Sequence, residues 1–158
     1  MRRAVAMLAL ALLTACGGAS QAAGPTPSPS PSSSPSSSAS GSPGLVFPID
    51  GKKYGTSATG TLTLTNLPGP GFFLDVKVSG LAADSNHVSH IHSGSCQQPG
   101  LILFALRPVV ADATGVAEAR SQVNATYPPK SGHWYVVIHA GPDMQGSNAT
   151  YLLCGNLF

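Results

Sequence analysis

Histidines are concentrated in one short stretch of the chain, which reads SNHVSHIHSGSC over residues 85–96. Side chains two residues apart in a β-strand share a face, so His90 and His92 would present two imidazoles about 7 Å apart. A third imidazole, His139, ends a separate and strongly β-prone segment, WYVVIH. Imidazole nitrogen is a ligand for both copper and zinc. The residue types and their spacing therefore predict a three-histidine metal site.

The other histidines fit this site less well. His87 is an odd number of residues from both His90 and His92, so strand parity places it on the opposite face. His133 shares the face of His139 but would lie roughly 20 Å away at the rise of a strand. Surface strands also carry His-x-His pairs without metal, so a purely structural reading of the pair stays open.

The elements that would position these residues are strands. Apolar and polar residues alternate with period two, and Gly/Pro turns separate the segments. No window of a dozen residues shows a good helical stripe. We expect an all-β domain, a Greek-key β-sandwich or flattened barrel of about seven to eight antiparallel strands. The expected strands are residues 60–67, 72–81, 87–92, 100–106, 115–123, 133–140 and 150–158.

The chain before this domain has a different composition. Residues 1–15 join two arginines to a short apolar run, which is typical of a secretory signal. The run ends in LLTAC, and this resembles a bacterial lipoprotein signal in which Cys16 becomes the lipidated first residue. Residues 16–44 are rich in Pro, Ser and Gly and carry no charge, which predicts a disordered tether. The β domain would then be residues 45–158, anchored to the membrane through Cys16 in a bacterial cell envelope, outside the cytoplasm.

Charge and cysteine content narrow the function further. Loss of Arg2 and Arg3 with the signal would leave six Lys and Arg against six Asp and Glu. This near-neutral chain has no basic patch, which argues against a nucleic-acid partner. With Cys16 lipidated, Cys96 and Cys154 remain, and an exported compartment favours their pairing as a disulfide.

Several motifs together resemble the copper/zinc superoxide dismutase family. The block GTLTLTNLPGPGFFLDVKVSGLAADSNHVSHIH is similar to its amino-terminal half, including the His-x-x-His-x-His spacing. VVADATGVAEARSQV, GHWYVVIHAGPDM and LLCGNL follow in the family's order. The similarity runs over most of residues 55–158.

The resemblance implies a role for individual residues. His90, His92 and His139 match copper ligands, and His87 matches a histidine that ties strands together through backbone hydrogen bonds. Asp143 matches an aspartate that supports a copper histidine, although it could equally be a simple turn residue in GPDMQG. The two cysteines of the domain match the family's disulfide.

The departures from the family are as informative as the matches. The long loop that carries the zinc ligands is replaced by QQPGLILFALRP (97–108), which has no His and no Asp, so we expect no zinc site. Tyr151 stands where the family has an arginine that guides superoxide. Arg107 could substitute for that arginine only if the shortened loop folds over the site.

The sequence leaves three functions open. The first is a lipoprotein that binds one copper ion and dismutates superoxide slowly. The second is a copper-handling module without turnover. The third is a structural domain without metal, because HIHSG followed by WYVVIHAG also resembles the chordin-type (CHRD) domains of exported bacterial proteins.

Overall fold

The computed structural model describes residues 44–158. The predicted signal peptide (1–15), the lipidation site Cys16 and all but the last residue of the predicted tether (16–44) lie outside the described residues. Neither of the two short 3-10 helices in the described part is long or apolar enough to span a membrane.

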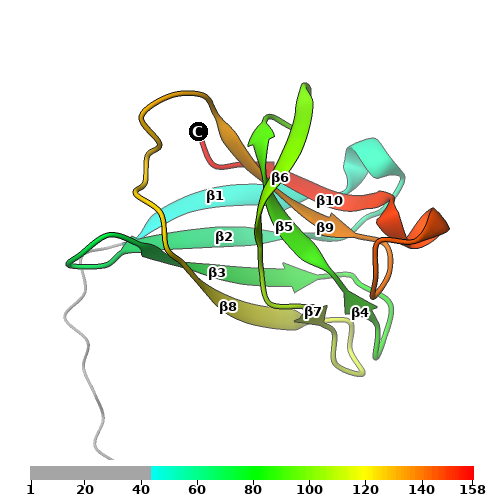
Figure 1. Ribbon diagram of the computed structural model, residues 1–158. Helices are drawn as coiled ribbons and strands as arrows, with labels where there is room; N and C mark the ends of the chain where they lie inside the picture. Colours follow the sequence, from blue (N-terminus) through cyan, green and yellow to red (C-terminus); the bar gives the residue numbers. More distant parts are fainter. Residues whose placement is uncertain (1–43) are drawn as a thin grey trace, which may run out of the picture. The chain divides into compact units, whose positions relative to one another are not determined.

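Residues 44–158 form an all-β domain, as the sequence predicts (Figure 1). Two one-turn 3-10 helices, η1 (Lys52–Tyr54) and η2 (Gly146–Ala149), interrupt the strands. The strands are β1 (Leu45–Asp50), β2 (Thr59–Asn66), β3 (Phe72–Ser79), β4 (Asn86–His87), β5 (Ser89–Gly94), β6 (Pro99–Ala105), β7 (Val109–Val110), β8 (Ala117–Val123), β9 (Trp134–His139) and β10 (Tyr151–Asn156).

Eight of the strands form one antiparallel sheet in the order β6-β5-β9-β10-β1-β2-β3-β8, and β4 pairs with β7 separately. The large sheet curls into a half-barrel, which Figure 1 shows. The order places strands that are distant in sequence side by side, with β3 next to β8 and β5 next to β9. The strands β6-β5-β9-β10 and β1-β2-β3-β8 form one continuous sheet, because Asp50 of β1 pairs with Cys154 of β10.

Period-two alternation accounts for these strands. In β2, Leu62 and Leu64 are buried, while the threonines that alternate with them are more exposed. In β3, Leu74 and Val76 are buried in the same way, and each pairs across the sheet with a leucine of β2. Burial of such a face from water is the main favourable contribution to folding.

The sheet has apolar residues on both faces at β9. Val136 and Ile138 belong to the main core inside the half-barrel. Tyr135 and Val137 point to the other face and pack with the two cysteines of the domain. His139 continues this second set by alternation. The metal-ligand candidates are therefore placed on the outer face of the sheet, away from the main core.

The sequence patterns do not predict two of the strands. β1 contains Pro48, which lowers a strand assignment because proline lacks the N–H of a ladder bond. β7 has only two residues. The predicted strand 87–92 is split at Val88, so that β4 and β5 belong to different sheets.

Candidate metal centre

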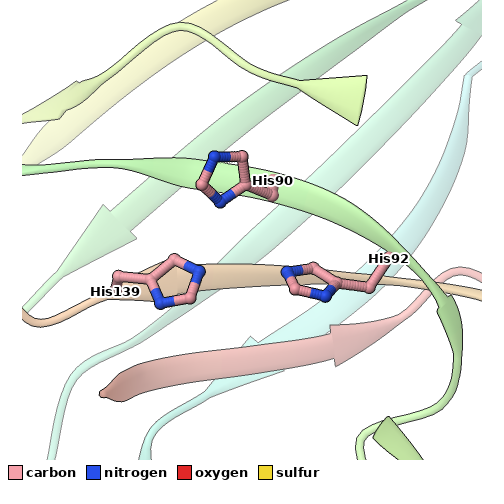
Figure 2. A group of neighbouring side chains, drawn as sticks. All are labelled: His90, His92 and His139. Carbon is pink, nitrogen blue, oxygen red and sulfur yellow. The ribbon is translucent and has the colours of Figure 1, made fainter. Parts of the chain in front are cut away.

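The three predicted ligand histidines lie together on two neighbouring strands. β5 and β9 are antiparallel neighbours, with His90 opposite Val137 and His92 opposite Tyr135. His139 lies at the end of β9, and its ring faces the other two (Figure 2). One nitrogen from each ring lies within 4.8 Å of the others. The fold therefore brings the three imidazoles to a common point, as the sequence predicts.

The nitrogens that converge are those without a hydrogen-bond partner. Within residues 44–158, the buried side-chain nitrogen and oxygen atoms that lack a partner are Nδ1 of His90, Nε2 of His92 and Nε2 of His139. Buried polar atoms are normally hydrogen-bonded, and an exception calls for an explanation such as an ion. Three such atoms at one point are the donor set that a metal bound by imidazole needs.

The opposite nitrogens of two rings are held by backbone carbonyls. Nδ1 of His139 donates to the carbonyl oxygen of Ala149 at 2.8 Å. Nδ1 of His92 donates to the carbonyl oxygen of Gly100 at 3.2 Å. A proton on Nδ1 leaves Nε2 as a bare lone pair, so these bonds fix the tautomer that a metal requires.

The electrostatic environment keeps the rings neutral. Burial lowers the pKa of His90, and the nearby rings of His139 and His92 lower it further. Burial also lowers the pKa of His92 and of His139, against an opposing effect of their carbonyl partners. Only neutral imidazole has a lone pair for a metal, so the site is ready to bind at neutral pH.

The three residues of the cluster differ in exposure, although the unpartnered nitrogen of each is buried. His139 and His92 expose 1% and 4% of their surface, whereas His90 is partly exposed. Val137 lies fully buried on the same face of β9, directly opposite His90 across the strand pair. A site with three protein ligands can keep a further coordination position for water or a small substrate.

Tyrosines line the buried side of the cluster. The ring centroid of Tyr135 lies 5.1 Å from that of His92, and the ring of Tyr151 meets that of His139 edge-on at 5.4 Å. The ring of Tyr54 packs on Tyr151 at 5.6 Å. Burial and the neighbouring Tyr135 raise the pKa of Tyr151 well above its ordinary range, so its phenol stays neutral. At the position where the resembling family has an arginine, this chain has Tyr151, and with Tyr54 and Tyr135 it forms an aromatic wall, a row of phenol rings beside the cluster.

His87 lies outside the cluster and contacts the backbone. Its Nδ1 donates to the carbonyl oxygen of His139 at 2.9 Å, and its Nε2 bonds the hydroxyl of Ser85 at 2.8 Å. The ring therefore ties β4 to the end of β9, which is the kind of contact that the resemblance implies.

Asp143 makes the contacts of a turn residue. Its carboxylate accepts hydrogen bonds from the N–H of Gln145 at 2.9 Å and the side-chain amide of Asn148 at 3.2 Å. The acceptor that holds His139 is the carbonyl of Ala149, in the helix that contains Asn148. Asp143 does not take the expected position beside a ligand histidine, and the turn interpretation is the one that these contacts support.

The remaining residues singled out by the sequence are the two cysteines of the domain and Arg107. Cys96 and Cys154 form a disulfide with a Cα–Cα distance of 5.9 Å, as predicted. Arg107 follows β6 as an exposed residue. Its N–H is bound to the hydroxyl of Ser121, and its carbonyl to that of Ser89.

Two members of the arrangement have no individual signal in the sequence, and a third could have been placed by its spacing. The carbonyls of Gly100 and Ala149 hold ligand histidines, but any residue type offers a carbonyl. Tyr135 could have been placed on the histidine face by its spacing of four residues from His139 in one strand.

Comparisons with known proteins give no family. No family model matches this chain, and no curated protein matches it. The likeness to copper/zinc superoxide dismutases thus depends on the sequence motifs alone.

Proposed function

We propose that the chain is an exported lipoprotein whose β domain binds one copper ion through His90, His92 and His139 and dismutates superoxide slowly. The observation that carries the proposal is the convergence of three buried ring nitrogens, each without a hydrogen-bond partner, within 4.8 Å of one another. A neutral imidazole whose lone pair is buried and unpaired is costly unless something binds it.

The donor set favours copper or zinc. Three neutral nitrogen ligands suit both ions, and copper binds such sites more tightly in the Irving–Williams order. The resemblance to copper ligands at all three positions selects copper between the two.

Bound copper would supply a redox couple that takes an electron from one superoxide and returns one to the next. His90, His92 and His139 hold the ion, and the carbonyls of Gly100 and Ala149 keep two of the rings in their ligand tautomer. His90 is the most exposed of the three residues, and an anion that reaches the ion would pass beside its ring.

Slow turnover follows from the surroundings of the cluster. A cation beside a site can raise the association rate of an anion by ten- to a thousandfold. By the sequence resemblance, Tyr151 stands where the family has its guiding arginine, and its ring lies against the rings of His92 and His139. This aromatic wall favours a second candidate, a copper-handling module that binds the ion without turnover.

The test is the metal content of the exported protein. Copper and zinc are measured by mass spectrometry in the wild type and in the His90→Ala, His139→Ala and His133→Ala variants. We expect about one copper per chain in the wild type and in His133→Ala, whose exposed ring lies near the carboxyl terminus. We expect none in the other two. Copper that persists in His90→Ala and His139→Ala overturns the site.

Superoxide decay separates the candidates. A rate above that of the His90→Ala variant, but well below the diffusion limit, supports slow dismutation. Bound copper without such decay supports the copper-handling module. A metal-free protein that copper does not stabilise supports the third alternative, a CHRD-like structural domain.

The proposed location has its own test. Lipidation of Cys16 would hold the domain at a membrane outside the cytoplasm, with residues 16–44 as the tether. The Cys16→Ala variant should leave the membrane fraction for the soluble fraction of the envelope or the medium. Membrane association that survives the substitution contradicts the lipid anchor.

A further inference from the structure

β6 departs from regular pairing with β5 next to the metal centre. His92 is opposite Ile102, but Gly94 is opposite Pro99, so residues 100 and 101 of β6 face the single residue 93. An extra residue of this kind is a β-bulge, which frees backbone groups from the ladder and re-aims them. Here both groups of one bulge residue, Gly100, are taken up by side chains.

These two side chains come from the site itself. The N–H of Gly100 donates to the hydroxyl oxygen of Tyr135 at 3.3 Å. The carbonyl oxygen of Gly100 accepts from Nδ1 of His92 at 3.2 Å. Gly100 therefore links the phenol of Tyr135 to the ring nitrogen that sets the tautomer of a ligand.

The close approach of the strands requires glycine at this position. A Cβ on Gly100 would lie 2.2 Å from the carbonyl oxygen of Ser93 and 2.6 Å from its hydroxyl. That hydroxyl also accepts a hydrogen bond of 3.0 Å from the N–H of Leu101. The bulge is thus held against β5 on one side and against Tyr135 on the other.

Tyr135 is itself fixed. It is fully buried, and its hydroxyl is 3.0 Å from the hydroxyl of Tyr151. Its ring lies beside that of His92, with an interplanar angle of 32°. The Tyr135 oxygen thus accepts the N–H of Gly100 and also shares a hydrogen bond with Tyr151, in which either hydroxyl can be the donor.

We propose that Tyr135 is a positioning residue for His92. Its hydroxyl holds the β6 bulge so that the carbonyl of Gly100 keeps the proton of His92 on Nδ1 and Nε2 directed at the metal position. Tyr151 supports the position of Tyr135 through the hydrogen bond between their hydroxyls. The consequence for copper affinity rests on the proposed function, whereas the consequence for the His92 tautomer concerns the metal-free protein and does not.

The first experiment is nitrogen-15 NMR of the histidine rings in the metal-free protein. We compare the wild type with Tyr135→Phe, which removes only the hydroxyl. Tyr54→Phe is the matched control, because Tyr54 contacts the ring of Tyr151 but its hydroxyl takes no part in this chain of hydrogen bonds in the described residues. We expect one His92 tautomer, protonated on Nδ1, in the wild type and Tyr54→Phe, and a mixture in Tyr135→Phe. An unchanged His92 tautomer in Tyr135→Phe overturns the proposal.

The second experiment is copper affinity and the electron paramagnetic resonance spectrum of bound Cu²⁺. Loss of an outer-shell partner typically weakens metal binding 10- to 100-fold, and we expect about tenfold for Tyr135→Phe, with a changed copper spectrum. Tyr54→Phe should match the wild type in both. Equal copper affinity in Tyr135→Phe and the wild type contradicts the positioning role of Tyr135 but leaves the proposed function intact. A wild type that binds no copper contradicts the proposed function but leaves the positioning role intact.

A further variant covers the case in which Tyr135→Phe does not fold. Tyr151→Phe removes the support of Tyr135 at a partly exposed position, outside the bulge. We expect the same change in the His92 signal, smaller in size. No change in that signal overturns the proposal.

Discussion

Nδ1 of His87 donates a hydrogen bond to the carbonyl oxygen of His139, across 2.9 Å and a sequence separation of 52 residues. A histidine that cannot reach the metal position thus holds the backbone of one that can. His87 is itself 4% exposed, so its ring is part of the buried structure. The contact explains why the histidine-rich stretch carries a ring on each face.

We expect His87→Ala to lower the free energy of unfolding by about 1–3 kcal/mol, the range for an unsatisfied buried polar group. Copper stoichiometry should stay at that of the wild type, because no ligand is removed. Urea unfolding and metal analysis measure the two quantities. His133→Ala, at an exposed ring, should change stability by no more than about 0.5 kcal/mol. Loss of copper from a folded His87→Ala protein would contradict the assigned role.

Removal of the disulfide should also act mainly on stability. The bond between Cys96 and Cys154 closes a loop of 58 residues between the segment after β5 and the middle of β10. The chain-entropy relation gives about 4 kcal/mol for such a loop. We expect the Cys96→Ser and Cys154→Ser double variant to unfold at correspondingly lower urea concentration. A double variant as stable as the reduced wild type is expected, and one as stable as the oxidised wild type would contradict the estimate.

The faces of the strands could be predicted because period two is a local property of the chain. Leu74, Val76 and Val78 are buried together, and His90 and His92 converge with His139 at the outer face. Parity also separates His87 from the cluster. The shared faces need only the alternation of side chains along a strand, whereas the meeting of His139 with His90 and His92 also needs the pairing of β9 with β5.

Other features depend on contacts between distant segments, and no local pattern encodes them. Two ligand rings are held by backbone carbonyls, at Gly100 and Ala149, which carry no residue-type signal. Asp143 has the side chain expected of a histidine partner but bonds within its own turn. Pro48 argues against a strand at β1 in the sequence. In the folded sheet β1 nevertheless pairs with β2 along its whole length, including the proline.

Substitution of His90, one of the proposed ligands, should affect copper binding and the stability of the metal-free domain in opposite directions. Nδ1 of His90 is buried without a partner, and such an atom costs free energy in the metal-free state. We expect metal-free His90→Leu to be more stable than metal-free wild type by about 1 kcal/mol. Copper at 100 times its Kd should stabilise the wild type by about 2.7 kcal/mol and leave the variant unchanged.

Urea unfolding with and without copper, after chelator treatment, measures these four values. The order of stability should therefore reverse between the two conditions. A metal-free variant that is less stable than the wild type, or a variant that copper still stabilises, would contradict the assignment of His90 as a ligand.

The stability of the metal-free domain should decrease in mild acid. The pKa values of His90, His92 and His139 are all lowered in the folded state, mainly by burial. The unfolded chain takes up protons at these residues near the ordinary value of about 6.5. Between that value and the lower folded values, the unfolded state holds more protons, so the free energy of unfolding falls as the pH falls. Well above about pH 6.5 neither state holds protons at these residues, so they cause no slope.

The test is urea unfolding of the metal-free protein at a series of pH values on both sides of 6.5. Among the described residues, the phenol of Tyr151 packs against the rings of His92 and His139, and burial and the neighbouring Tyr135 raise its pKa, so it adds no charge change in this range. His90→Leu should show a smaller slope, because one of the three proton-binding groups is removed while the other two remain buried. An equal slope in both proteins, or stability that rises toward acid, would show that the cluster is not held neutral by the fold.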